Sequence, residues 1–167
     1  MTDEDRKLVS AWVDAARNSN ITDELESVYE SVRVEIETRS PACWASGRCC
    51  NFDKTTHLLY VTGLEAAYTL TRLPADQTIS TADVQTAREG GGCPFQKLNL
   101  CGVHTIKPLG CRTFFCDRSS TEWQHVLTER SLDRIKALHE RFDVPYRYGE
   151  WRQMLATIID AGPTSGG

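Results

Sequence analysis

Seven cysteines in two groups are the residues of this 167-residue chain best suited to chemistry. The upstream cysteines are Cys43, Cys49 and Cys50, and the downstream cysteines, within residues 90–117, are Cys93, Cys101, Cys111 and Cys116. Thiolate sulfur is a soft donor that selects zinc, copper(I) or iron–sulfur clusters over hard ions. We therefore expect the two groups to fold onto each other around metal, with all seven cysteines as candidate ligands.

The number and spacing of the cysteines leave the kind of site open. A tetrahedral zinc site and a four-iron cluster each take four ligands, so seven cysteines allow one site with three spare thiols, or one site and a second completed by other donors. The gaps between the cysteines match neither a zinc finger nor a bacterial ferredoxin. If the backbone is extended, adjacent Cys49 and Cys50 point apart and serve different roles.

Charge and composition exclude several classes of protein. The formal net charge is −4, whereas a nucleic-acid surface needs a concentrated basic face, and no apolar run reaches the roughly 18–20 residues of a membrane span. The first residues, MTDEDRKLVS, are charged and lack the apolar core of a secretory signal. We therefore expect a reducing cytoplasmic location, where structural disulfides are rare, and neither a nucleic-acid nor a membrane partner.

Local patterns predict the elements that must position the cysteines. Apolar spacing and capping residues indicate helices at 3–18, 21–38, 62–73, 80–88, 119–142 and 150–159, a strand at 57–61 and a hairpin at 95–103. Asn20 or Thr22 is the expected cap of the second helix, and the first two helices are expected to form an antiparallel hairpin. The predicted fold is mainly α: five or six helices packed around a loop-rich cysteine core with at most one small β-hairpin. We expect a single domain over 1–162 and a disordered tail at 163–167.

The ordered motifs of residues 43–117 resemble those of the zinc- or iron-chelating cysteine-cluster family known by its CxxCxxCC signature. This chain has CWASGRCC at 43–50, CPF at 93–95, CGVH at 101–104, Lys107-Pro108 and CRTFFC at 111–116. Three positions depart from the family pattern. Ser46 replaces its second cysteine, His104 its tyrosine and Lys107 its arginine.

The four histidines were considered as further ligands. His104 is a candidate imidazole ligand because it lies three residues from Cys101, and His57 is a weaker one. His125 and His139 lie in a long predicted helix without nearby cysteines, and we expect both at the surface.

The resemblance also implies what the metal is. Because relatives similar to flagellin lysine N-methylase imply an iron–sulfur centre, we favour a [4Fe-4S] cluster over zinc. Arg112, beside Cys111, is then expected to hydrogen-bond a sulfur or to neutralise the centre. An enzyme that transfers a methyl group or an electron is the alternative, with a cleft expected beside His104, Arg112 and Phe114. A zinc-stabilised adaptor that binds a protein partner through Trp44 is a further alternative.

Overall fold

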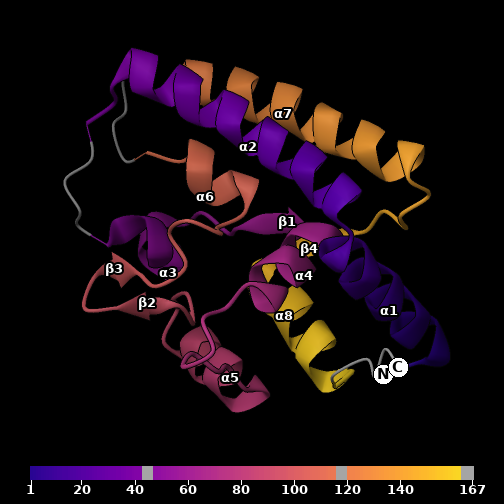
Figure 1. Ribbon diagram of the computed structural model, residues 1–167. Helices are drawn as coiled ribbons and strands as arrows, with labels where there is room; N and C mark the ends of the chain where they lie inside the picture. Colours follow the sequence, from indigo (N-terminus) through magenta and orange to yellow (C-terminus); the bar gives the residue numbers. More distant parts are fainter. Residues whose placement is uncertain (43–46, 116–119, 163–167) are drawn as a thin grey trace.

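The computed structural model describes residues 1–42, 47–115 and 120–162, and this part of the chain is mainly helical (Figure 1). Its α-helices are α1 (Asp3–Arg17), α2 (Ser19–Arg39), α3 (Phe52–Thr55), α4 (Gly63–Thr71), α5 (Thr81–Glu89), α6 (Leu109–Thr113), α7 (Thr121–Arg141) and α8 (Trp151–Asp160), and η1 (Arg48–Cys50) is one turn of 3₁₀-helix. The short strands are β1 (Tyr60–Thr62), β2 (Gln96–Lys97), β3 (Leu100–Cys101) and β4 (Tyr148–Glu150). The predicted mainly α class is confirmed.

The six long helices lie where the apolar spacing placed them, and most of their caps are local. The hydroxyl of Thr62 and the carboxylate of Glu65 form the predicted capping box at the start of α4. The predicted cap of α2 is wrong, because Asn18 rather than Asn20 or Thr22 accepts the first backbone bond. At α7 the N-cap is Ser120, whose side chain makes no capping hydrogen bond.

The helices pack in pairs that join distant parts of the sequence. The helix α1 packs mainly on α4, α2 lies along α7, and α8 packs against α4 and α5 (Figure 1). The expected antiparallel hairpin of α1 and α2 is wrong. Asn18 alone links the two helices, and one residue is too short for the reversal that an αα-hairpin needs. The core includes Trp12, Leu25, Val32, Leu64, Leu127, Ile135, Trp151 and Leu155.

Two two-stranded antiparallel sheets complete the described part of the chain. The strands β2 and β3 form the predicted hairpin, which turns at Leu98 and Asn99. The second sheet was not predicted, because it pairs β1 with β4 across more than 80 residues. A hydrogen bond from the backbone N–H of Trp151 to the Leu59 carbonyl (2.8 Å) extends this link. The start of α8 is thereby held against the middle of the chain.

Two short helices, α3 and α6, were also missed. They have four and five residues, which is too short for an apolar period to show. Both lie next to cysteines, since α3 follows Cys50 and α6 contains Cys111. Within the residues described, no helix combines the length and apolar character needed to cross a lipid bilayer.

Candidate metal centre

Backbone hydrogen bonds bring the upstream segment 47–53 against the downstream segment 91–96. The Cys93 N–H donates to the Cys50 carbonyl (2.9 Å), and the Asp53 N–H donates to the Gly91 carbonyl (3.1 Å). The Gln96 side chain donates to the Gly47 carbonyl (2.9 Å). Gly47 has φ +68°, and a Cβ there would lie 2.9 Å from the backbone of Asn99, so a glycine is required for this close approach. These bonds hold two parts of the chain about 40 residues apart at the same place.

Four of the described cysteines meet at this junction. The thiols of Cys49, Cys93 and Cys101 lie close enough to the Cys50 thiol to shift its pKa. The cysteines come from η1, from the loop before the hairpin and from β3, and all described cysteines are free thiols. Cys43 and Cys116 lie outside the described residues, as do Ser46 and Trp44.

The shared contact makes three of these thiols more acidic. Hydrogen bonding from Cys50 is the main cause that lowers the pKa of Cys49 and of Cys101 to about 6, and the positive charge of Lys107 lowers both further. Hydrogen bonding from Cys50 is also the main cause that lowers the pKa of Cys93, and the Phe95 N–H donates to the Cys93 sulfur. Contacts with the surrounding sulfurs raise the pKa of Cys50 far above its usual range. One protonated thiol therefore lies among three sulfurs that favour the thiolate form.

Trp151 is a residue of this site that the sequence did not indicate. Its indole N–H is buried and makes no hydrogen bond of ordinary geometry in the described part of the chain, yet it lies close enough to Cys93 to lower the pKa of that thiol. A buried donor without a partner costs about 1–3 kcal/mol. A thiolate at Cys93 would accept this hydrogen bond, so the environment fits an ionised sulfur. Trp151 follows Cys93 by 58 residues, and no local pattern could have linked them.

The described sulfurs are close together, but they do not surround a position that a metal ion could occupy. Among the residues described, no group of three or more His, Cys, Asp or Glu side chains has the arrangement of a metal site, and Cys50 takes the central place among the four thiols. Cys111 is a fifth cysteine near these sulfurs. Burial raises the pKa of its thiol well above the usual value, and the nearby charges of Cys93 and Cys101 raise it further. Thiolate sulfur is the kind of donor that soft metals prefer.

Glu65 ties the helix of Cys111 to the rest of the molecule. Its carboxylate is buried, with 1% of its surface exposed, and it accepts from the Leu109 N–H (2.8 Å) at the start of α6. It also accepts from the Tyr29 hydroxyl (3.2 Å) on α2 and from both the N–H (2.9 Å) and the hydroxyl (3.0 Å) of Thr62. One side chain therefore holds α2, α4 and α6 in place.

The described hydrogen bonds of Arg112 go to carbonyl oxygens and not to sulfur. Its Nε donates to the Lys107 carbonyl (2.8 Å) and its Nη2 to the Thr105 carbonyl (3.0 Å). The guanidinium lies over the Tyr29 ring, 4.0 Å from the ring centroid. Arg112 thus shapes the turn before α6.

The four histidines lie in four different environments. His104 lies beside Lys107, with 3.3 Å between Nε2 and Nζ, and the charge of Lys107 lowers the pKa of the imidazole. His57 stacks on Phe114 with ring centroids 4.6 Å apart, and His125 is exposed. The expectation that His139 is a surface residue is wrong, because it is only 2% exposed. It lies on the face of α7 that is turned toward the chain after Phe142, where Nδ1 bonds the Val144 carbonyl (3.0 Å).

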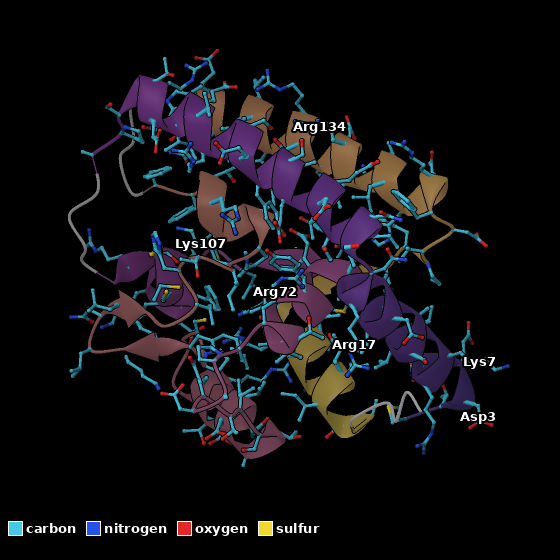
Figure 2. All side chains as sticks on the ribbon, viewed as in Figure 1. Asp3, Lys7, Arg17, Arg72, Lys107 and Arg134 are labelled. Atoms are coloured by element: carbon cyan, nitrogen blue, oxygen red, sulfur yellow. The ribbon has the colours of Figure 1, made fainter. Side chains whose placement is uncertain are left out.

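A cavity of about 860 Å³ lies beside the thiols. Four cysteines line it (Cys49, Cys50, Cys101 and Cys111), together with His104, Arg112 and Phe114. Lys107 also lines it and lies between α6 and α3, as Figure 2 shows. A cleft therefore exists where an enzyme at this centre would require one.

No protein-family model, curated protein or solved structure matches this chain. The family resemblance of residues 43–117 therefore stays a prediction.

Proposed function

We propose that this protein binds a soft metal centre through cysteine thiolates, with Cys49, Cys50, Cys93 and Cys101 as the ligands. The observation that carries this proposal is the closeness of the Cys50 thiol to the thiol of its neighbour Cys49 and to the thiols of Cys93 and Cys101 from the downstream part of the chain. Three sulfurs that favour the thiolate form concentrate negative charge at one place, which a cation would neutralise, and sulfur donors select soft metals. The centre is a [4Fe-4S] cluster, which the motif resemblance favours, or a zinc ion.

The surroundings of the thiols support the same proposal. The Phe95 N–H donates to the Cys93 sulfur, and the Val103 N–H donates to the Cys101 sulfur. Hydrogen bonds of this kind stabilise sulfur in its charged form and tune a metal site. Trp151 would add a second N–H donor at Cys93. Cys43, Cys111 and Cys116 remain as further thiols for this centre or for a second one.

An enzyme that transfers an electron or a methyl group is the second candidate. The cavity beside the thiols favours it, because the cavity is lined by the side chains of His104, Arg112 and Phe114. A purely structural metal site needs no such space. The cavity residues would then bind and orient a substrate next to the centre.

Metal analysis of protein purified without oxygen tests the proposal. We expect either about four irons per chain with broad absorption near 400 nm, or about one zinc per chain without colour. The double variant Cys93→Ser/Cys101→Ser should lose the metal, whereas Lys97→Ser, on the exposed face of the same hairpin, should retain it. Wild-type protein that carries neither iron nor zinc, and takes up neither when it is supplied, would overturn the proposal.

A further inference from the structure

The cavity beside the thiols has the size and walls of a small-molecule site. Its volume of about 860 Å³ lies within the roughly 300–1,000 Å³ of ligand pockets. Its lining includes apolar and aromatic side chains of α2 (Tyr29, Val32 and Ile36), together with Phe52 of α3, Leu59 and Phe115. An apolar ligand body would bury its surface there.

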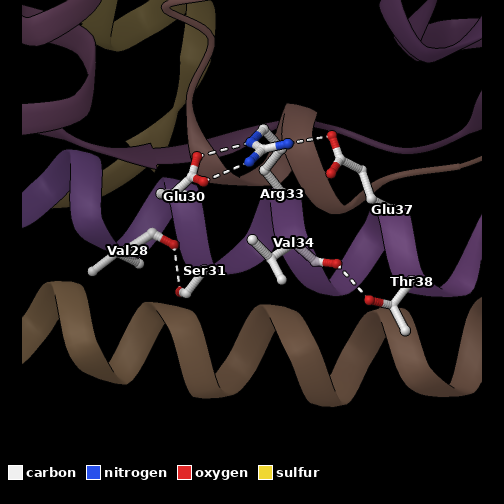
Figure 3. A network of polar contacts seen from close by, with 7 residues as sticks. All are labelled: Val28, Glu30, Ser31, Arg33, Val34, Glu37 and Thr38. Atoms are coloured by element: carbon white, nitrogen blue, oxygen red, sulfur yellow. Dashed lines mark hydrogen bonds and ion pairs between the residues drawn. The ribbon is translucent and has the colours of Figure 1, made fainter.

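The acidic side chains at the α2 wall are paired with arginines. Arg33 pairs with both Glu30 and Glu37, as Figure 3 shows. The Glu26 carboxylate accepts from the Tyr68 hydroxyl (2.9 Å) and faces Arg72 at 3.6 Å. Because Glu30 and Glu37 share one arginine, these pairs reduce the repulsion of an anion by this wall and do not remove it.

Lys107 and Arg112 supply positive charge to the lining of the cavity. Among the residues described, neither Lys107 nor Arg112 has a carboxylate within ion-pair distance. In the described part of the chain, the Nζ of Lys107 is in hydrogen-bond contact with a histidine nitrogen, and Arg112 donates to carbonyl oxygens. A cation beside apolar walls attracts an anion more strongly than a cation in bulk water does.

We propose that this cavity binds an amphipathic organic monoanion, whose carboxylate pairs with Lys107 and whose apolar body lies along α2 against Tyr29 and Ile36. The neutral imidazole of His104 lies next to the expected carboxylate position and accepts from Lys107, which orients the ammonium group. This site goes beyond the proposed metal centre and does not depend on it. The alternative role of Lys107 is to neutralise the thiolates of Cys49 and Cys101, because its positive charge lowers the pKa of both thiols.

Calorimetric titration of the purified protein with decanoate tests the proposal, with decanol as the uncharged probe of equal length. We expect decanoate to bind at least about tenfold more tightly than decanol. Lys107→Met should reduce decanoate binding to the decanol level, and Lys97→Met should leave it unchanged, because Lys97 is an exposed lysine of the hairpin that does not line the cavity. Ile36→Trp should abolish the binding of both probes by filling the apolar part.

The alternative results are distinct. Equal binding of decanoate and decanol, or no heat with either, would overturn the proposal. A Lys107→Met variant that loses metal while it binds decanoate normally would also overturn it and would assign the lysine to the thiolates. Metal content measured on the same samples separates the two proposals, because protein without metal that still binds decanoate through Lys107 would support this site alone.

Discussion

At the residue scale, Glu65 and His139 are two buried ionisable side chains that bond to residues outside their own helices. Glu65 accepts four hydrogen bonds from three other residues, so its burial is compensated. His139 bonds the Val144 carbonyl through Nδ1, while its Nε2 is buried without a described partner. Both side chains therefore contribute to the free energy of unfolding, although their polar types alone would suggest exposed positions.

The variant Glu65→Gln should lower the free energy of unfolding by about 2–4 kcal/mol, because the amide NH2 would face hydrogen-bond donors and leave them unsatisfied. Urea unfolding followed by circular dichroism measures the loss. Asp83→Asn is the matched control, since Asp83 forms the same kind of capping box at α5 but is exposed. Its loss should be much smaller, and equal losses would show that Glu65 acts only as a helix cap.

Acid should destabilise the protein through His139. Burial lowers the pKa of this imidazole below its ordinary 6.5, so the unfolded chain binds a proton more readily than the folded chain does. The stabilising contribution is present above pH 6.5 and is lost as the pH falls toward the folded pKa. In His139→Gln, the fall in unfolding free energy between pH 7.5 and 5.5 should be smaller by an amount on the order of 1 kcal/mol. His125→Gln, on the exposed face of the same helix, should keep the wild-type fall.

At the element scale, the contact of α1 with α4 is the tightest that the glycines reveal. Gly63 is the first residue of α4, and a Cβ there would lie 2.2 Å from ring atoms of Trp12. Trp12 is fully buried, and its indole N–H donates to the Pro145 carbonyl (2.8 Å). The ring therefore has little freedom to move away, and the close approach of the two helices depends on the missing side chain.

Gly63→Ala should therefore lower the free energy of unfolding by about 2 kcal/mol through overpacking. Thermal unfolding and near-ultraviolet circular dichroism of Trp12 measure the change. Gly90→Ala is a suitable control, because the nearest atom to its Cβ would be 3.4 Å away. A Gly63→Ala protein as stable as the control would mean that Trp12 moves aside without cost.

On the scale of the whole molecule, the described chain combines a helical framework with a cysteine region built from short elements. The framework consists of α1, α2, α4, α7 and α8, which carry most of the buried hydrophobic residues. The cysteine region comprises residues 47–56 and 93–113 and contains no α-helix longer than five residues. Its short elements offer little stability of their own.

Removal of metal should consequently affect the two parts differently. After chelation without oxygen, we expect amide hydrogen exchange to rise at least about tenfold in residues 47–56 and 93–113, because metal binding contributes to the folding of such regions. The helices α1, α4 and α8 should keep their protection. Exchange that rises equally throughout the chain, or in neither part, would contradict this division.

The sequence by itself determined the long helices, the hairpin and the two groups of thiols. Apolar spacing, capping boxes such as Thr62–Glu65 and turn residues act over a few positions, so each can be read locally. The short helices α3 and α6 and the strand pair β1–β4 could not be predicted in this way. Their residues are stabilised by distant parts of the chain, such as the bond from the Leu109 N–H to Glu65.

Only the tertiary structure decided which side chains meet at the candidate centre. It placed Cys50 among Cys49, Cys93 and Cys101, and it placed Trp151, a residue of the last helix, beside Cys93. It also buried His139, which the sequence had suggested to be exposed. The physical reason is the same in each case. Burial and side-chain contact depend on how separate elements pack, and residues 58 positions apart share no local pattern that records their contact.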